Sequence, residues 1–423
     1  MSNILINILF LSTVLLSADW VGIDSNIPQS PYVELMNSDI ESAVLKMELN
    51  GFNLNSHLIE EEEYFSVDFP TSASLMNAGY PDLPKFSKSI IIPNNKSMKY
   101  TVIDSEYIEY QDINIAPSKG NLSRMIDPAS IPYEFNEVYD LNSFYPQEIV
   151  MLNEPYILRD YRGQVVQFNP IQYNPVTKIL RVYTDIEIQV IGNQEPALNP
   201  FNRIKQLKQI DNEYSNIYSN HFLNFENENT RFEYLVDQGN MLVICYDAFM
   251  SEMEPFVEWK NRKGIPTEMV SVSSVGSSSS AIQNYVSDYY YDNGLTFLLL
   301  VGDVDQIPTP IISGASSDPS YGFISGSDSY AEVIVGRFSG STPSHIETQV
   351  ERSLTYEQNP AQTSHFNNAL GIASNQGPGM NGYSDDDFND WLWETLISDV
   401  YGSYQGIYDS NGGSASQGLS AIN

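Results

Sequence analysis

Three acidic residues in the second half of the chain have the sequence context of a cation site. Asp303 follows the apolar run 296–301 (TFLLLV), and open α/β sheets bind their ligands at the carboxyl ends of strands. Asp328, Tyr330 and Glu332 alternate, so in an extended chain they project to one side. Carboxylates with nearby carbonyl oxygens suit calcium, although the spacing of an EF-hand loop is missing. A role in a loop or as a helix cap explains Asp303 equally well.

A second acidic group ends the loop 374–387 (SNQGPGMNGYSDDD) and precedes an expected helix. Capping and the helix macrodipole favour carboxylates at this position, which is the simplest explanation of Asp385, Asp386 and Asp387. The functional alternative is that one of them lines a pocket for a cationic substrate side chain.

Cys245 is the single cysteine, so an intramolecular disulfide framework and a multi-thiolate metal site are both excluded. It lies within the apolar run 241–246 (MLVICY), which predicts a buried strand. A thiolate nucleophile needs accessible, electropositive surroundings, which a cysteine in the middle of a strand lacks. We therefore expect Cys245 to be structural.

The composition is that of a folded, strongly acidic protein. The 423 residues include 54 Asp and Glu against 20 Lys and Arg, for a net charge of −34, together with 28 Tyr and 19 Phe. The length suggests two or three domains. Nucleic-acid binding and adsorption to anionic lipid both need a basic face, so the charge argues against them.

The N-terminus predicts export. Residues 4–16 (ILINILFLSTVLL) form an apolar run that suits a signal peptide over residues 1–18 better than a membrane span. The alternative is a buried N-terminal strand or helix. Beyond this run we expect no membrane span.

Residues 19–195 predict a β-rich, antiparallel domain, because short β-branched and aromatic runs are separated by Pro, Asn and Gly turns. The run 179–190 (ILRVYTDIEIQV) shows the period-two alternation of a half-buried strand. Residues 196–236 are rich in Asn and Glu and predict an exposed, partly helical connector, in which we expect His221 to be solvated.

Residues 237–423 predict an α/β domain. Continuous apolar runs such as 296–301 are typical of strands buried on both faces of a parallel sheet. Helices of roughly ten residues are expected between such runs, near 281–290 and 344–356, and this alternation predicts βαβ units with right-handed crossovers.

Several segments resemble the gingipain-type cysteine peptidases. They are residues 256–264 (FVEWKNRKG), 297–308 (FLLLVGDVDQIP), 321–338 (YGFISGSDSYAEVIVGRF) and 351–359 (ERSLTYEQN), in the order of that family. The upstream region, with residues 79–93 (GYPDLPKFSKSIIIP), is similar to the inhibitory propeptide of the family. The resemblance implies a β-rich propeptide domain followed by an α/β domain with a mainly parallel, caspase/gingipain-like sheet.

The resemblance also implies a secreted or cell-surface endopeptidase that acts on proteins or peptides through a Cys–His dyad. The histidine of the family lies in a Gly-His-Gly segment, and none of His57, His221, His345 and His365 is flanked by glycines. We therefore expect the sequence to be truncated before the dyad and to contain no catalytic residue. The chain should be inactive and keep its propeptide, with the bond after Arg231 as the expected processing site.

By the same resemblance, the main-chain carbonyls of Ser325 and Tyr330 would complete a calcium site with Asp303, Asp328 and Glu332. Asp385 corresponds to the carboxylate at the base of the primary pocket in arginine-specific members. The alternative function is a non-catalytic, secreted, calcium-binding interaction module with the same fold.

Overall fold

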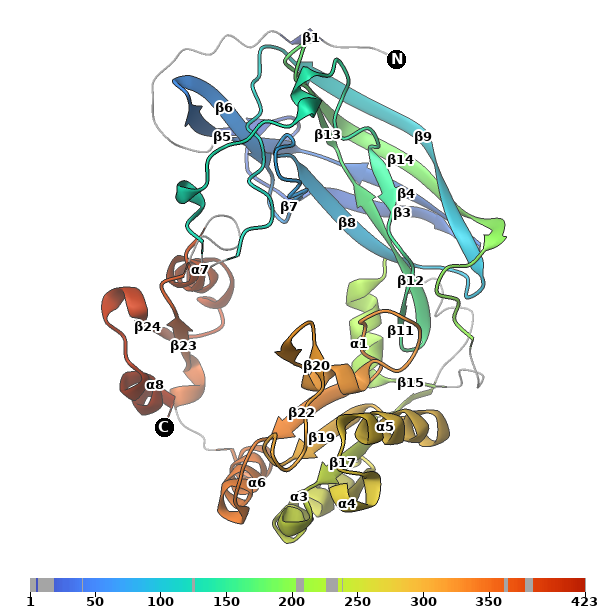
Figure 1. The fold of residues 1–423 in the computed structure, drawn as a ribbon, viewed down its shortest axis with the longest axis vertical. Coiled ribbons are helices and arrows are strands. Elements are labelled where there is room, and N and C mark those ends of the chain that lie inside the picture. Colours follow the sequence, from blue (N-terminus) through green and yellow to red (C-terminus); the bar gives the residue numbers. More distant parts are fainter. Residues whose placement is uncertain are drawn as a thin grey trace.

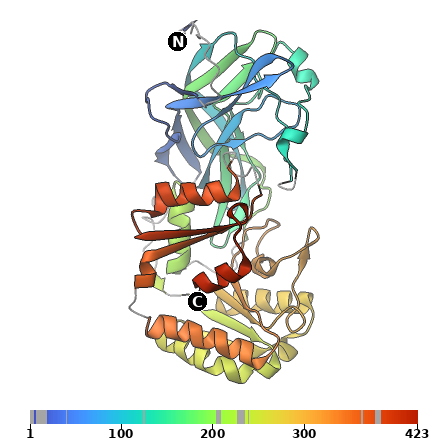
Figure 2. The ribbon, with the colours of Figure 1, turned by 90° about the vertical axis from the view of Figure 1, so that its left-hand side faces the viewer.

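The computed structural model describes residues 5–6, 19–39, 41–123, 126–202, 209–225, 235–237, 239–360, 364–376 and 383–422. Figures 1 and 2 show two parts stacked end to end, which we call the N-terminal unit (residues 19–225) and the α/β unit (residues 235–422). Most of the predicted signal peptide lies outside the described residues; β1 (Leu5–Ile6) pairs with β9. None of the described helices is long and apolar enough to cross a membrane.

Antiparallel sheets sharing one apolar core build the N-terminal unit, as the sequence predicted. The first sheet orders β9 (Lys96–Tyr110), β14 (Ile179–Pro196), β4 (Ser42–Glu48) and β3 (Tyr32–Ser38), with β13 (Ile171–Asn174) also paired to β14. The second orders β10 (Val150–Leu152), β12 (Tyr161–Phe168), β8 (Pro84–Ile91) and β7 (Ala73–Ser74), with β11 (Tyr156–Leu158) also paired to β12. A third contains β2 (Asp19–Gly22), β5 (Gly51–Ile59) and β6 (Glu62–Asp68).

The alternation predicted for residues 179–190 is present in β14. Val182, Ile186 and Ile188 are fully buried in the apolar core, while Arg181, Asp185 and Glu187 next to them are partly exposed. A register shift between Tyr183 and Asp185 interrupts the alternation, so Thr184 is only partly buried. Such a bulge places one extra residue in a strand and leaves it unpaired in the ladder.

Residues 196–202 of the connector are exposed or partly exposed, as predicted. The segment 209–225 is packed, and the prediction of exposure is wrong there. It forms β15 (Gln209–Asp211) and α1 (Asn212–His221), and Tyr214 and Tyr218 of α1 are buried in an aromatic cluster with β11 and β12. His221 is not solvated as expected: Tyr156 Oη lies 2.6 Å from its Nε2, and burial lowers the pKa of the ring. The predicted processing bond after Arg231 lies outside the described residues.

The α/β unit contains a four-stranded parallel sheet in the order β18 (Thr267–Ser271), β17 (Met241–Cys245), β19 (Phe297–Val301) and β22 (Ile334–Phe338). Leu242 and Ile244 pack under α5 (Ser279–Asn293) on one face. Val243 and Cys245 pack under α3 (Met250–Lys263) and α6 (Pro343–Gln358) on the other. This is the predicted parallel α/β arrangement.

The helices and strands that follow α6 form a separate group. β23 (Asn368–Ala373) and β24 (Ser403–Tyr408) pair in a two-stranded parallel sheet beside α7 (Asp385–Leu392), followed by α8 (Ala415–Ile422). Figure 1 shows this group to one side of the four-stranded sheet.

Equal register gives the four-stranded sheet two distinct ends. Met241 pairs with Phe297, and Phe297 with Ile334, at the amino end; Cys245, Val301 and Phe338 align at the carboxyl end. A residue that precedes one strand therefore lies at the opposite end from a residue that follows another.

Glu357 of α6 joins α6 to α3 and is the basis of a stability prediction. It accepts hydrogen bonds from Trp259 Nε1 (2.9 Å), Lys260 Nζ (2.5 Å) and Lys263 Nζ (3.0 Å). Burial disfavours its charged form, but these donors outweigh burial and lower the pKa of the carboxyl to about 2. Ionised Glu357 therefore stabilises the folded state at pH values above 4.5, the ordinary pKa of a glutamate. This stabilisation is lost as the pH falls toward 2 and the carboxylate is protonated.

We expect Glu357→Gln to lower the free energy of unfolding by about 1 kcal/mol at pH 7, with the difference shrinking below pH 4. Urea unfolding of both proteins at pH 7 and at a pH below 4 measures this difference in the free energy of unfolding. Glu351→Gln, on the exposed face of α6, is the control and should change little. An equal effect of both substitutions at pH 7 would contradict the prediction.

Candidate functional site

The carboxyl end of the four-stranded sheet is where an α/β protein is expected to bind its ligand. The turn after β19 begins at Gly302, whose φ of +135° is unfavourable for other residues. Arg337 of β22 holds this turn, because its Nη1 donates to Gly302 O (2.8 Å) and Ile307 O (2.9 Å). Asp303 belongs to the turn: its Oδ1 accepts from Val304 N, and its own N donates to Gly340 O.

Cys245 ends β17 at the same end of the sheet but is fully buried. Its Sγ donates to Tyr246 O at 3.3 Å. Burial, with smaller contributions from Asp247 and Glu252, raises the pKa of the thiol to about 12. These surroundings suppress the thiolate, as expected for a structural cysteine.

Asp385 opens α7, directly after the N-cap Ser384. Its Oδ2 accepts from Ser374 Oγ (2.7 Å) just beyond β23, and its N donates to Gln376 O (3.0 Å). Ser384 Oγ also donates to Asp387 Oδ2 (2.7 Å), so hydrogen bonding around the cap accounts for the acidic first turn. The carboxylate of Asp385 is partly exposed and held in one orientation.

Glu332 lies on the segment just before β22, at the amino end of the sheet, and is fully buried. Its Oε2 accepts from Ile324 N (2.7 Å) and Ser325 N (2.9 Å), whereas its Oε1 finds no hydrogen-bond partner among the described residues. Burial raises the pKa of Glu332 to about 7, and nearby Asp328 adds to this effect.

Asp328 accepts hydrogen bonds from both units. Its Oδ1 accepts from Tyr330 N (3.0 Å) in its own loop. Its Oδ2 accepts from Ile157 N and Asn199 Nδ2, both at 2.8 Å, in the N-terminal unit.

The structure does not bring Asp303 together with Asp328 and Glu332, as the predicted calcium site required. Asp303 follows β19 and Glu332 precedes β22, so the in-register pairing of these strands places them at opposite ends of the sheet. Five strand residues separate the ends by roughly 16 Å. Within the described ranges, no three His, Cys, Asp or Glu side chains are grouped to hold a metal ion.

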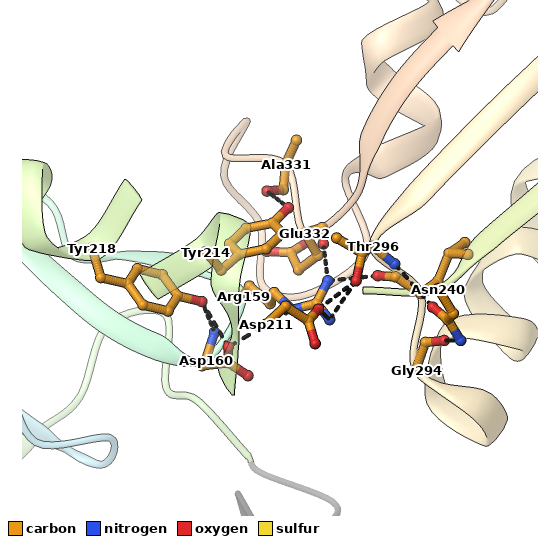
Figure 3. A network of polar contacts seen from close by, with 11 residues as sticks. Arg159, Asp160, Asp211, Tyr214, Tyr218, Asn240, Gly294, Thr296, Ala331 and Glu332 are labelled. Atoms are coloured by element: carbon orange, nitrogen blue, oxygen red, sulfur yellow. Dashed lines mark hydrogen bonds and ion pairs between the residues drawn. The ribbon is translucent and has the colours of Figure 1, made fainter. Parts of the chain in front are cut away.

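Arg159 is the central residue of a buried polar cluster at the amino end of the sheet (Figure 3). It occupies the turn between β11 and β12 with a φ of +48°. Its Nη1 donates to Leu295 O (2.5 Å) and Glu332 O (2.9 Å), and its Nη2 donates to Asp211 Oδ2 (2.6 Å). Thr296 Oγ1 donates to the same Asp211 oxygen. We call Arg159, Asp211, Thr296 and the two carbonyls the Arg159 cluster.

Aromatic contacts surround the Arg159 cluster. The guanidinium lies 4.4 Å from the ring centre of Tyr214, and Tyr214 Oη donates to Ala331 O at 3.4 Å. Tyr156 stacks on Tyr330 with the ring centres 4.0 Å apart. Sequence reasoning missed this site, because an Arg-Asp pair in a short turn carries no sign of a partner more than a hundred residues away.

Comparison with known proteins identifies the class to which a β-rich unit followed by this α/β unit belongs. Residues 24–232 match the propeptide profile of peptidase family C25, and residues 235–418 match the profile of peptidase family C25 itself. The chain therefore belongs to the gingipain-type cysteine peptidase family, as the sequence segments indicated.

Individual relatives agree with this family assignment. The chain is similar to Gingipain R2 of Porphyromonas gingivalis, at 34% identity over 383 residues that cover 89% of this chain and 51% of that protein. It is also similar to Lys-gingipain of that organism, at 24% identity over 70% of this chain and 18% of that protein. The chain thus spans about half the length of Gingipain R2.

Among solved structures, the chain is similar to the complex of Porphyromonas gingivalis RgpB pro- and mature domains. The identity is 34% and the TM-score 0.43, with 47% of this chain and all of that chain covered. The Arg-specific cysteine proteinase gingipain R (RGPB) matches at 36% identity and a TM-score of 0.38, over 40% of this chain and 41% of that one. Both TM-scores are below 0.5, so the assignment to the family rests on the sequence matches.

The burial of Cys245 predicts an unreactive thiol. With a pKa of about 12, about 10⁻⁴ of the thiol is ionised at pH 8. Alkylation by iodoacetamide at pH 8 should therefore be at least 100-fold slower in the native protein than in urea, as measured by mass spectrometry. Equally fast labelling in both states would show that Cys245 is accessible.

Proposed function

We propose that the chain carries the propeptide and part of the catalytic domain of a secreted, gingipain-like cysteine endopeptidase. The supporting observation is the pair of consecutive matches, to the family's propeptide over residues 24–232 and to its peptidase over residues 235–418. In this proposal the N-terminal unit keeps the peptidase latent until the connector is cut, with the bond after Arg231 as the processing site.

The proposed reaction is hydrolysis of a peptide bond by a thiolate, with a histidine as proton acceptor and donor. Cys245 does not suit the role of nucleophile, because its thiol is buried and its pKa is raised. In the part of the chain that the structure describes, His57 and His221 are hydrogen-bonded inside the N-terminal unit. We therefore propose that residues 1–423 alone have no peptidase activity.

Asp385 is our proposed determinant of specificity. A carboxylate fixed by Ser374 at the start of α7 could pair bidentately with the guanidinium of an arginine substrate. This pairing is strong where water is excluded, and a neutral aliphatic side chain gains nothing from it.

The test compares the full product of the gene, after removal of the propeptide, on peptides with Arg or Leu before the cleaved bond. We expect preference for Arg, and Asp385→Asn should lower kcat/KM for the Arg peptide by about 100-fold while the Leu peptide is unaffected. Asp387→Asn, in the same helical turn, is the control. Residues 1–423 alone should cleave neither peptide under reducing conditions.

Two outcomes would count against this proposal. Equal cleavage after Arg and Leu by the full product would remove the assigned role of Asp385. Thiol-dependent cleavage by residues 1–423 that disappears in Cys245→Ala would make Cys245 the nucleophile.

We further propose calcium as a stabilising ligand near Asp328 and Glu332. The orphaned, buried Oε1 of Glu332 suits a cation, and the carbonyls of Ser325 and Tyr330 belong to the same loop. Asp303 does not fit this group, because it lies at the other end of the sheet. When bound, calcium would supply charge balance for two neighbouring carboxylates.

Chelation tests the calcium proposal. Calcium at a hundred times its Kd stabilises the folded protein by about 2.7 kcal/mol. Removing it with a chelator should therefore lower Tm by about 5 °C. Glu332→Gln should abolish this response, whereas Asp303→Asn should preserve it. Identical melting curves with and without chelator would exclude the site.

A further inference from the structure

A cavity of about 380 Å³ lies in the N-terminal unit, lined by Tyr80, by residues between 136 and 148, and by Met151 of β10. Its Tyr145 exchanges two backbone hydrogen bonds with Tyr173 of β13, at 2.9 and 2.8 Å. Figure 1 shows β13 in the part of this unit that is remote from the α/β unit. The volume is at the small end of the range for ligand sites, so the cavity suits one small organic group.

Aromatic rings form much of the cavity wall. Tyr80 and Tyr145 lie with their ring centres 5.1 Å apart, and Phe144 follows in the same wall. Arg181, which is outside the lining, places its guanidinium 3.8 Å from the ring centre of Phe144 and is paired with Glu109. Aromatic faces attract cations, so the tyrosine rings offer a second surface of the kind that Arg181 already contacts.

The lining carries negative charge. It contains Glu137 and Glu148, and no lysine, arginine or histidine of the described ranges belongs to it. Glu148 Oε2 accepts a hydrogen bond from Tyr100 Oη at 2.8 Å. Burial and this hydrogen bond raise the pKa of Tyr100 to about 12, so the phenol stays a donor at neutral pH. Both glutamates are exposed, so a cation can reach them from solvent.

Apolar side chains complete the lining. Val138 is buried, whereas Leu141 and Met151 are 52% and 44% exposed. Such surfaces suit the methylene stem of a long cationic side chain, which packs on apolar groups while its charged end stays near carboxylates. A bare metal ion fits less well, because it needs several oxygen ligands converging on one point. The lining therefore favours an organic cation with an alkyl stem.

Buried amides hold this lining in place. Gln172 Nε2 donates to Pro146 O (2.7 Å) and to Gln147 O (3.2 Å). Asn169 Nδ2 donates to Glu148 O at 2.9 Å. Gln172 is 4% exposed and Asn169 is fully buried, and a buried amide is costly without its hydrogen bonds. The backbone of residues 146–148 is thus fixed before a ligand arrives, which reduces the entropy lost on binding.

We propose that this cavity binds an alkylguanidinium group, either of a free small molecule or of an arginine side chain in a polypeptide. Glu148 is the carboxylate that pairs with it, and Tyr145 is the aromatic wall. A planar guanidinium can pair with a carboxylate and stack on a ring together, whereas an ammonium is a compact, strongly hydrated charge. The site is independent of the proposed function, because neither Asp385 nor Cys245 lines the cavity.

Calorimetric titration of residues 1–423 tests the site. Agmatine represents the free alkylguanidinium, and a blocked tripeptide with a central arginine represents the side chain within a polypeptide. The same tripeptide with citrulline is the neutral control, since its urea group has nearly the same shape. We expect one site with a Kd on the order of 1 mM, and binding of the citrulline peptide weaker by about 10-fold or more. The tighter of the two cationic probes identifies the source of the ligand.

Variants locate the binding. Glu148→Gln keeps an acceptor for Tyr100 and should weaken binding of the arginine peptide by about 10-fold, as should Tyr145→Leu. Glu154→Gln changes an exposed glutamate outside the lining and should leave the affinity unchanged. Asp385→Asn removes the other carboxylate proposed to pair with arginine and should also have no effect. Thermal melts verify that each variant is folded, and Glu148→Gln decides the test if Tyr145→Leu is not.

Equal affinity for the arginine and citrulline peptides would overturn the proposal, as would unchanged affinity in folded Glu148→Gln. Absence of binding at about 10 mM probe would overturn it too. Binding that disappears in Asp385→Asn but persists in Glu148→Gln would place the ligand at the proposed specificity site instead. Failure of the cavity and failure of the proposed function are therefore distinguishable.

Discussion

The in-register parallel pairing of β17, β19 and β22 determines which side chains of the α/β unit can meet. Backbone hydrogen bonds maintain this register, so residues that precede a strand stay a full strand length from residues that follow its neighbour. Cys245 and Asp303 consequently belong to one end of the sheet, and Thr296 and Glu332 to the other. The contact with the N-terminal unit thus uses the end opposite to the one at which such sheets bind ligands.

Buried arginines join distant segments in a chain that has 54 acidic and only 20 basic residues. Arg159 donates to two backbone carbonyls across the contact between the units, and Arg337 donates to two in the turn after β19. Arg162 is fully buried and donates to the carbonyls of Pro93, Lys96, Leu198 and Asn199. A planar guanidinium with five N–H donors can satisfy several carbonyls at once, which a lysine ammonium does less well in fixed geometry.

Predictions that depended on local pattern agree with the structure. The alternation in β14 and the continuous apolar runs of β17 and β19 determine which faces are buried, so both fold classes were readable from the sequence. The connector shows the limit of this reasoning. Its Asn-rich composition predicts exposure, yet Tyr214 and Tyr218 are buried, because β11 and β12 supply an apolar surface that composition cannot reveal.

The sequence by itself determined the order of the two units, the likeness to a peptidase family and the burial of Cys245, because each depends on runs of neighbouring residues. Only the tertiary structure decided that Asp303 lies apart from Glu332, and that Arg159 contacts Leu295 and Glu332 across more than a hundred residues. A local pattern reports the face that a side chain occupies. The group opposite that face depends on strand order, register and the docking of two units, which no short segment encodes.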